Sequence, residues 1–300
     1  MFVLPTFNLG VVASPLNVFD PNLTFPTIQV FNTEAEFITQ TNAPQYTIVH
    51  AKDTDKLYVW NGSAWYLYNN DPFNIYSVNF DGTNDYMDIP DSTALETTAF
   101  TWSAWFYCTA IDRYNIIVDT ATNSSSFNGY EIFVVNTTNK IRFASYHSTD
   151  QIDSTTVVAA NTWYHVVATH ESGSDKLYVN GSLEASGSAS NFSVSDVANL
   201  RIGSSSLFSL YHQGLIDEVS FFNSALSASD VSSIYNSGPN DISSLNPVGW
   251  WRMGDTGSDY GTATITNAAT ESNSGGSSIN GTIENGSSGN TSPTYSTDVP

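Results

Sequence analysis

Acidic side chains recur at short intervals in two turn-rich stretches of this sequence, and such stretches are candidates for calcium binding. The first, "FDGTNDYMDIPD", carries Asp81 and Asp85, and the second, "MGDTGSDYG", carries Asp255. Calcium takes several oxygen ligands, from carboxylates and carbonyls that converge on one point. The spacing does not match the EF-hand loop, and solvated acidic turns are the alternative interpretation. We therefore name Asp81, Asp85 and Asp255 as candidate calcium ligands and expect no other cofactor.

Glycoside hydrolysis would need two carboxylates that face one cleft, where they act as acid and as base or nucleophile. The strand signature Glu-x-Asp followed by Glu is absent from the sequence. Asp217 and Glu218 are the nearest pair, but adjacent residues of a strand point to opposite faces. We assign them a structural role. The five histidines show no metal-ligand spacing, and we predict that the protein is not an enzyme.

The charge balance narrows the range of partners. The chain has 29 Asp and Glu residues against 8 Lys and Arg residues, a formal net charge of −21. Phosphate contacts need clustered Lys and Arg, so we expect no nucleic-acid partner. Cys108, the only cysteine, lies in an apolar strand pattern that predicts a buried, unreactive thiol. No apolar segment approaches the length of a membrane span, and the first residues lack the charged start of a secretory signal, so we expect no membrane insertion.

Changes in composition divide the chain into three regions. Residues 1–30 are apolar without a helix or strand period and are interrupted by prolines. Such a segment cannot form a core alone and is too hydrophobic for a solvated tail, so we expect an extended arm for attachment or oligomerisation. Residues 31–71 contain one short helix pattern and three strand patterns, which predict a small β-meander module. Residues 72–300 are the third region, whose last part, 241–300, ends in a low-complexity tail.

Short strand patterns with turn clusters between them recur from residue 75 to residue 237. This texture is typical of an antiparallel sandwich or jelly roll. The segment "FTWSAWFY" is apolar on both faces and should be a central strand. The pair Asn180-Gly181 favours a tight type I′ hairpin, because both residues tolerate a positive φ. One helix is expected in "SASDVSSIYN", with Ser227 as its N-cap and Gly238 at its end.

A set of strings within residues 75–240 carries a resemblance to a known family. They are, in order, "VNFDGTNDYMDIP", "FTWSAWFY", "NTWYHVVATHESGSDKLYVNGSLEASG", "LRIGSS" and "GLIDEVSFFNSALSASDVSSIYNSG". As a set they resemble the laminin G-like, concanavalin A-like jelly-roll superfamily. The resemblance implies an all-β fold, an antiparallel jelly-roll sandwich of two curved sheets. The segment "VGWWRM" precedes the "FDG" strand in many relatives but follows the helix here, so we expect 241–300 to supply a permuted strand to the same sandwich.

The arrangement with "DEVSFFNSALSASDV" before "VGWWRMGD" also resembles virion structural proteins of marine bacteriophages. This resemblance implies a non-enzymatic fibre, head-decoration or tail-appendage subunit at the surface of the phage particle, for particle stabilisation or host-surface contact. Its expected partners are other virion proteins, further copies of itself as a homo-oligomer, and a host-surface glycan. The alternative is a carbohydrate-binding module of a cell-surface or secreted protein. The attachment interface would consist of large apolar side chains of the arm: Phe2, Leu4, Phe7, Leu9, Val12, Phe19 and Phe25.

Overall fold

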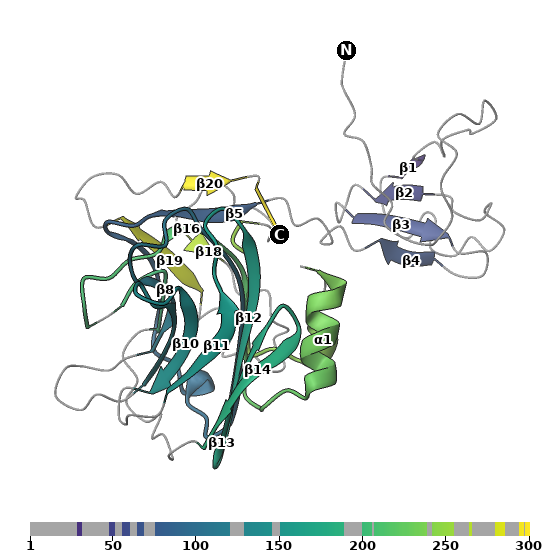
Figure 1. Cartoon of the computed structure of the whole chain (residues 1–300). Coiled ribbons are helices and arrows are strands. Elements are labelled where there is room, and N and C mark those ends of the chain that lie inside the picture. Colours follow the sequence, from purple (N-terminus) through teal and green to yellow (C-terminus); the bar gives the residue numbers. More distant parts are fainter. Residues whose placement is uncertain are drawn as a thin grey trace, which may run out of the picture. The chain divides into compact units, whose positions relative to one another are not determined.

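The computed structural model of the 300-residue chain divides into two compact units, residues 1–70 and 71–300, and each is described by itself (Figure 1). In the first unit the structure describes four short strands. In the second it describes the following ranges: 76–120, 129–145, 151–188, 200–205, 207–238, 242–254, 264–265, 280–285, 294–296 and 298–300.

The first unit contains one four-stranded sheet. Its strands, in spatial order, are β1 (Gln29–Phe31), β2 (Ile48–Ala51), β3 (Lys56–Trp60) and β4 (Trp65–Tyr68). The last three pair antiparallel, whereas β1 pairs parallel to β2. The start of β1 falls in the segment expected to be an arm, because a three-residue strand leaves no alternation to recognise in the sequence. The expected helix over 34–40 lies outside the described residues.

The second unit is a sandwich of two antiparallel sheets, which confirms the predicted fold class. Sheet I contains, in spatial order, β11 (Gln151–Val157), β10 (Lys140–Ser145), β9 (Tyr130–Val134), β8 (Asn115–Asp119), β15 (Leu200–Ile202), β6 (Asp85–Ile89), β19 (Gly281–Asn285) and β18 (Thr264–Ile265). Sheet II contains β14 (Ser182–Gly187), β13 (Ser174–Val179), β12 (Trp163–Glu171), β7 (Phe100–Cys108), β16 (Gln213–Phe222), β5 (Ser77–Asp81) and β20 (Thr294–Ser296), and β17 (Gly249–Trp251) also pairs with β16.

The expected central strand is β7, which lies between β12 and β16. All of its residues are buried except the half-buried Tyr107. Trp102 and Phe106 point into the core between the sheets, while Trp105 packs on the opposite side, under the helix. Cys108 is fully buried, and burial raises the pKa of its thiol to about 12, so the thiol is unreactive as expected.

The helix α1 (Ala228–Ser237) covers the outer side of sheet II (Figure 1). Ser227 and Asp230 form a reciprocal capping box, and Gly238 ends the helix with a φ of 68°. Tyr235 stacks on Trp105 with a ring separation of 5.7 Å. Two 3-10 helices, η2 (Thr93–Leu95) and η3 (Ser243–Leu245), complete the described helical elements, none of which is long and apolar enough to cross a membrane.

The segment after α1 contributes to the sandwich through several strands. In β17, Trp251 is buried in the main core and stacks on Trp102 at 6.1 Å, whereas Trp250 joins a smaller apolar cluster with Ile234 of α1. Further along, β19 pairs with β6 and β20 with β5. The low-complexity tail is therefore not only loop, because backbone pairing and one core residue, Ile283, suffice to hold β19 in sheet I.

Candidate functional site

The side of sheet I that faces away from sheet II, named here the outer face, carries several polar and charged side chains. On β10, Ile141 and Phe143 point into the core, so Arg142 between them points outward. One row of side-by-side residues crosses this face: Gln151, Ala144, Glu131, Asp119, Arg201, Asp88 and Thr282. A second row contains Asp153, Arg142, Phe133 and Ile116.

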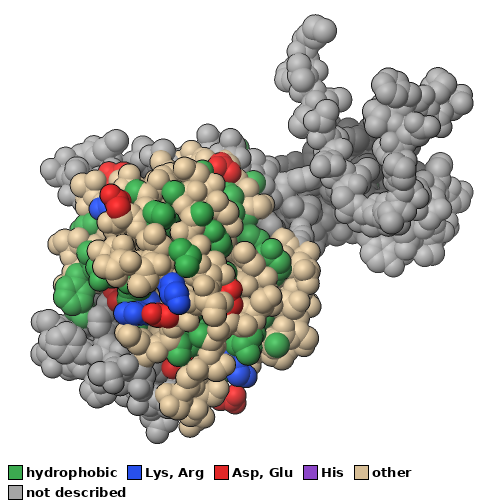
Figure 2. Space-filling view, in the orientation of Figure 1, with side chains coloured by type: hydrophobic (Ala, Val, Ile, Leu, Met, Phe, Trp, Pro, Cys, Tyr) green, Lys and Arg blue, Asp and Glu red, His purple; other side chains and the backbone are tan. Residues whose placement is uncertain are grey.

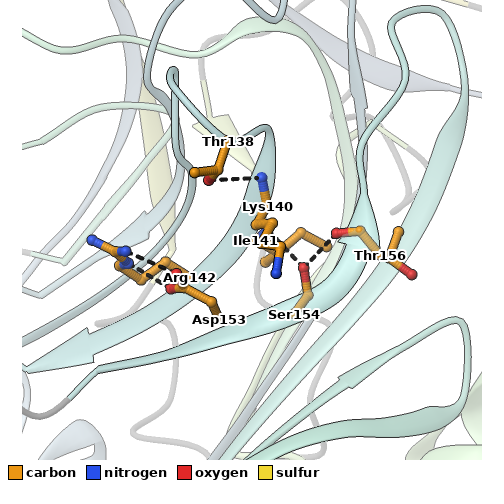
Figure 3. A network of polar contacts seen from close by, with 7 residues as sticks. All are labelled: Thr138, Lys140, Ile141, Arg142, Asp153, Ser154 and Thr156. Atoms are coloured by element: carbon orange, nitrogen blue, oxygen red, sulfur yellow. Dashed lines mark hydrogen bonds and ion pairs between the residues drawn. The ribbon is translucent and has the colours of Figure 1, made fainter.

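A two-pronged ion pair joins β10 and β11 on the outer face (Figure 3). Arg142 Nε donates to Asp153 Oδ1 at 2.6 Å, and Arg142 Nη2 donates to Asp153 Oδ2 at 2.8 Å. Both side chains are part-exposed, and their hydrogen bonds lower the pKa of the Asp153 carboxyl. The positive charge of Lys140 lowers it further. The pair thus presents a rigid, planar set of donors and acceptors at the surface.

A second planar group lies on β6 and β15 of the same face. The guanidinium of Arg201 lies over the Tyr86 ring, 4.3 Å from its centre, and Arg201 Nε is 3.6 Å from Asp88 Oδ1. Burial raises the pKa of the Tyr86 hydroxyl, which therefore stays protonated in neutral solution. The stack holds a tyrosine ring and a guanidinium in fixed, half-buried positions.

The connection between β15 and β16 folds onto the outer face and exposes an aromatic ring. Leu210 packs against an apolar cluster of that face that includes Ile116 and Phe133. Ser205 Oγ accepts hydrogen bonds from the backbone N–H groups of Leu207 at 3.4 Å and Phe208 at 3.3 Å. The Phe208 side chain remains 52% exposed. This turn holds the backbone that presents the ring to solvent.

Two carboxyl groups meet beneath this connection, where neither was expected. Asp119 of β8 and Glu131 of β9 are paired across the strands, and both side chains are buried. Burial first, and then the negative charge of Asp119, raise the pKa of Glu131 to about 9. Glu131 also has hydrogen bonds with Asp119 and Ser205. The pair therefore holds a proton at neutral pH.

The acid pair does not form a hydrolytic site. Hydrolytic carboxyl groups flank the scissile bond, and the retaining geometry already needs them about 5 Å apart. Asp119 and Glu131 instead bond to each other and have almost no exposed surface. Sequence reasoning missed them because they are twelve residues apart. The only signal was an acidic residue at the end of one apolar strand pattern, "IIVD", and near the start of the next, "YEIF".

Two of the calcium candidates, Asp81 and Asp85, lie in one tight turn. Asp81 Oδ1 accepts the backbone N–H groups of Thr83 at 2.7 Å and Asn84 at 3.3 Å, and Asp85 Oδ2 accepts that of Asp81 at 3.0 Å. Asp255 is not among the described residues, and neither are the arm residues named above. Within the described part, no three acidic, histidine or cysteine side chains gather as a metal site. The calcium assignment stays a prediction.

Asp217 and Glu218 have a structural role. Glu218 has a φ of 47° in an irregular part of β16, and its carboxylate accepts from Trp250 Nε1 and, at 3.0 Å, from Arg252 Nε. Asp217 Oδ1 accepts the Glu218 backbone N–H at 2.8 Å. These buried bonds connect β16 to β17, and they leave neither carboxylate at the surface.

Histidine and serine meet once in sheet II, also away from solvent. Ser103 Oγ lies 2.8 Å from His165 Nε2, and the imidazole packs between Trp105 and Tyr235 of α1. Burial lowers the pKa of His165 to about 3, so the ring is neutral in ordinary buffers. A substrate could not reach this pair, because α1 covers it.

Comparisons with known proteins agree with this architecture. A family described as the concanavalin A-like lectin/glucanases superfamily matches residues 81–232, just over half of the chain. The structure of a candidate carbohydrate-binding protein from Bacteroides ovatus aligns over 85% of this chain and 70% of its own, with 18% identity and a TM-score of 0.56. None of the curated proteins matches the chain in sequence.

Two further solved structures align over about half of this chain. The carbohydrate-binding module CBM40 of the Ruminococcus gnavus IT-sialidase aligns over 53% of this chain and 97% of its own, with 14% identity and a TM-score of 0.46. A pentraxin from Limulus polyphemus aligns over 54% of this chain and 82% of its own, with 15% identity and a TM-score of 0.45.

Proposed function

The chain belongs to the concanavalin A-like lectin/glucanases superfamily, and from its outer face we propose that it binds carbohydrate and does not cleave it. One observation carries this proposal: an exposed ring, Phe208, is presented by a loop anchored to a face that also holds the Tyr86–Arg201 stack and the Arg142–Asp153 pair. The Bacteroides ovatus structure, which shares the fold, is likewise of a candidate carbohydrate-binding protein.

The chemistry of this face suits a sugar. A pyranose ring has apolar C–H faces, which pack on aromatic rings, and an equator of hydroxyl groups, which need donors and acceptors in fixed positions. Phe208 and Tyr86 offer rings, while Arg142 and Asp153 offer donors and acceptors in one rigid group. Fixing these groups before binding reduces the entropy lost when a ligand is bound.

Binding without cleavage is favoured by the state of the carboxyl groups. The paired acids Asp119 and Glu131 are buried and bonded to each other, and Asp153 is held by Arg142. The non-catalytic assignment from the sequence and the geometry of this face therefore point in the same direction.

The proposal is tested by glycan-array and calorimetric binding of the full chain. Phe208→Ala should weaken glycan binding at least about tenfold, because the sugar ring loses the aromatic surface on which it packs. Leu183→Ala is the matched control, because Leu183 is an apolar side chain of similar exposure, 51%, on sheet II. Equal losses in both variants, or no glycan binding by the wild-type chain, would contradict the proposal.

A place at the surface of a phage particle stays a second prediction, which rests on the sequence resemblance. The arm residues that would attach the subunit lie outside the described residues. Mass spectrometry of purified particles tests this location, and a carbohydrate-binding sandwich would suit contact with a host surface. Absence of the chain from the particles would leave the carbohydrate-binding proposal in place without the virion.

A further inference from the structure

We infer that the outer face selects uncharged glycans and discriminates against glycans that carry carboxylates or sulfates. This inference rests on the proposed carbohydrate-binding function and names the ligand class of the same face. The reason is the position of the Lys and Arg side chains, whose positive charges an acidic sugar would need.

Every Lys and Arg of the second unit lies among the described residues. Six of the eight Lys and Arg residues belong to residues 71–300, and all six are described: Arg113, Lys140, Arg142, Lys176, Arg201 and Arg252. The segments of this unit that the structure does not describe contain no Lys or Arg, although they contain acids such as Asp150 and Asp196. Those segments therefore contain acids and one histidine, His147, but no Lys or Arg whose charge is permanent.

Each cation of the outer face already neighbours a carboxylate. Asp153 binds Arg142 through both of its oxygens and also feels the charge of Lys140, while Arg201 lies beside Asp88 and over a tyrosine ring. Figure 2 shows the same arrangement on the face it displays, where each group of Lys and Arg side chains lies beside Asp or Glu side chains.

Of the remaining three cations, two donate hydrogen bonds within the unit and one belongs to a strand of sheet II. Arg252 is buried and donates to Glu218, Arg113 donates to Gln213 at 2.7 Å, and Lys176 belongs to β13 of sheet II.

A carboxylate on the ligand would thus lose its hydration shell on binding and would lie beside acidic side chains. Recognition of an acidic group usually relies on an Arg or Lys whose charge is not already compensated, and best on a two-pronged arginine contact. On this face Asp153 occupies that contact of Arg142. The net charge of the whole chain, −21, adds repulsion at long range that salt would screen. An uncharged sugar needs only the hydrogen bonds and the ring surface.

The experiment uses the full chain and matched pairs of oligosaccharides, in which the C6 hydroxymethyl groups of one member are replaced by carboxylates in the other. The neutral member should bind at least about tenfold more tightly, because like charges placed against each other are strongly unfavourable. Binding of the neutral member should be insensitive to salt between low and high ionic strength. Equal or tighter binding of the acidic member would overturn the inference and leave the proposed function intact. If neither member of any pair binds, both the inferred selectivity and the proposed carbohydrate-binding function are wrong.

A charge variant tests the mechanism directly. Asp153→Asn leaves the Arg142 guanidinium without a carboxylate partner. The ratio of affinities for the neutral and the acidic sugar should therefore fall severalfold. Glu171→Gln removes one negative charge from an exposed position of β12 and should leave the preference unchanged. Circular dichroism and melting curves of both variants confirm that they are folded. If Asp153→Asn is folded and the preference does not change, or changes equally in Glu171→Gln, the assignment of selectivity to the Arg142–Asp153 pair is wrong.

Discussion

Replacing Glu131 by glutamine should change how the stability of the second unit depends on pH. In the folded chain burial and the neighbouring Asp119 raise the pKa of Glu131 to about 9, against an ordinary value of 4.5. Between these two values the folded state holds one proton more than the unfolded state. The contribution of Glu131 to the free energy of unfolding is therefore fully present below pH 4.5 and is lost as the pH rises towards 9.

The size of the effect follows from the linkage between proton binding and folding. Each pH unit inside this window costs about 1.4 kcal/mol of unfolding free energy, so the interval from about pH 5.5 to 7.5 costs about 3 kcal/mol. A glutamine amide can donate to Asp119 as the protonated carboxyl does, but it does not titrate. The unfolding free energy of Glu131→Gln should therefore match that of the wild type near pH 5. Above pH 5 it should exceed the wild-type value by a difference that grows with pH.

The assay is urea unfolding of the full chain at a series of pH values, with near-ultraviolet circular dichroism as the signal that monitors unfolding. The informative quantity is the difference between the wild-type and variant curves, because the buried His165 and His212, with pKa values lowered by burial to about 3 and about 4, act equally in both. The exposed-site variant Glu171→Gln is the control and should run parallel to the wild type. Parallel curves for Glu131→Gln would show that the pair does not hold a proton at neutral pH.

Further predictions concern the packing of the second unit and the arm. Trp251→Ala should cost about 3–5 kcal/mol of unfolding free energy, measured by urea titration, because the indole is fully buried in the main core. Gly214→Ala should prevent stable folding, since its Cβ would lie 1.9 Å from the Tyr107 carbonyl oxygen, whereas Gly173→Ala has open space and should cost only about 1 kcal/mol for its positive φ; similar melting temperatures would refute the difference. A chain ending at Ser237 lacks β17, β19 and β20 and should aggregate, and a melting temperature equal to that of the full chain would contradict this. Deletion of residues 1–30 should leave the sandwich folded and abolish oligomerisation or particle attachment, as light scattering and particle binding would show.

Local sequence patterns were sufficient to predict much of the fold. The run of apolar residues on both faces of "FTWSAWFY" predicted a central strand, and β7 lies between two neighbours in the middle of sheet II. Ser227 predicted the start of α1, because a capping box is made within four residues. Asn180 and Gly181 have φ values of 48° and 75°, as the predicted type I′ turn between β13 and β14 requires. These features depend on residues close together in the chain, so short patterns are enough to recognise them.

The candidate site was not predictable in this way. Its polar groups come from several strands of sheet I, and no short motif connects them. Asp81 and Asp85 stood out in the sequence because they share one turn, where the structure shows their carboxylates bonded to backbone N–H groups. No comparable pattern singles out Arg201 or Phe208, since their roles depend on the neighbours that the fold places beside them.

The chemical character of the protein can be read from its residues alone: an acidic, all-β chain with few cations, no paired-carboxylate strand motif and one unreactive cysteine. Which charged side chains lie next to one another depends instead on the folded arrangement of the strands. The pairing of Asp119 with Glu131 and of Arg142 with Asp153 depends on the register of four neighbouring strands, β8 to β11. A shift of one residue in any of them would turn these side chains towards the core, since side chains alternate along a strand. Register is set by burial of the whole apolar face against sheet II, and so the site exists only once the sandwich has closed.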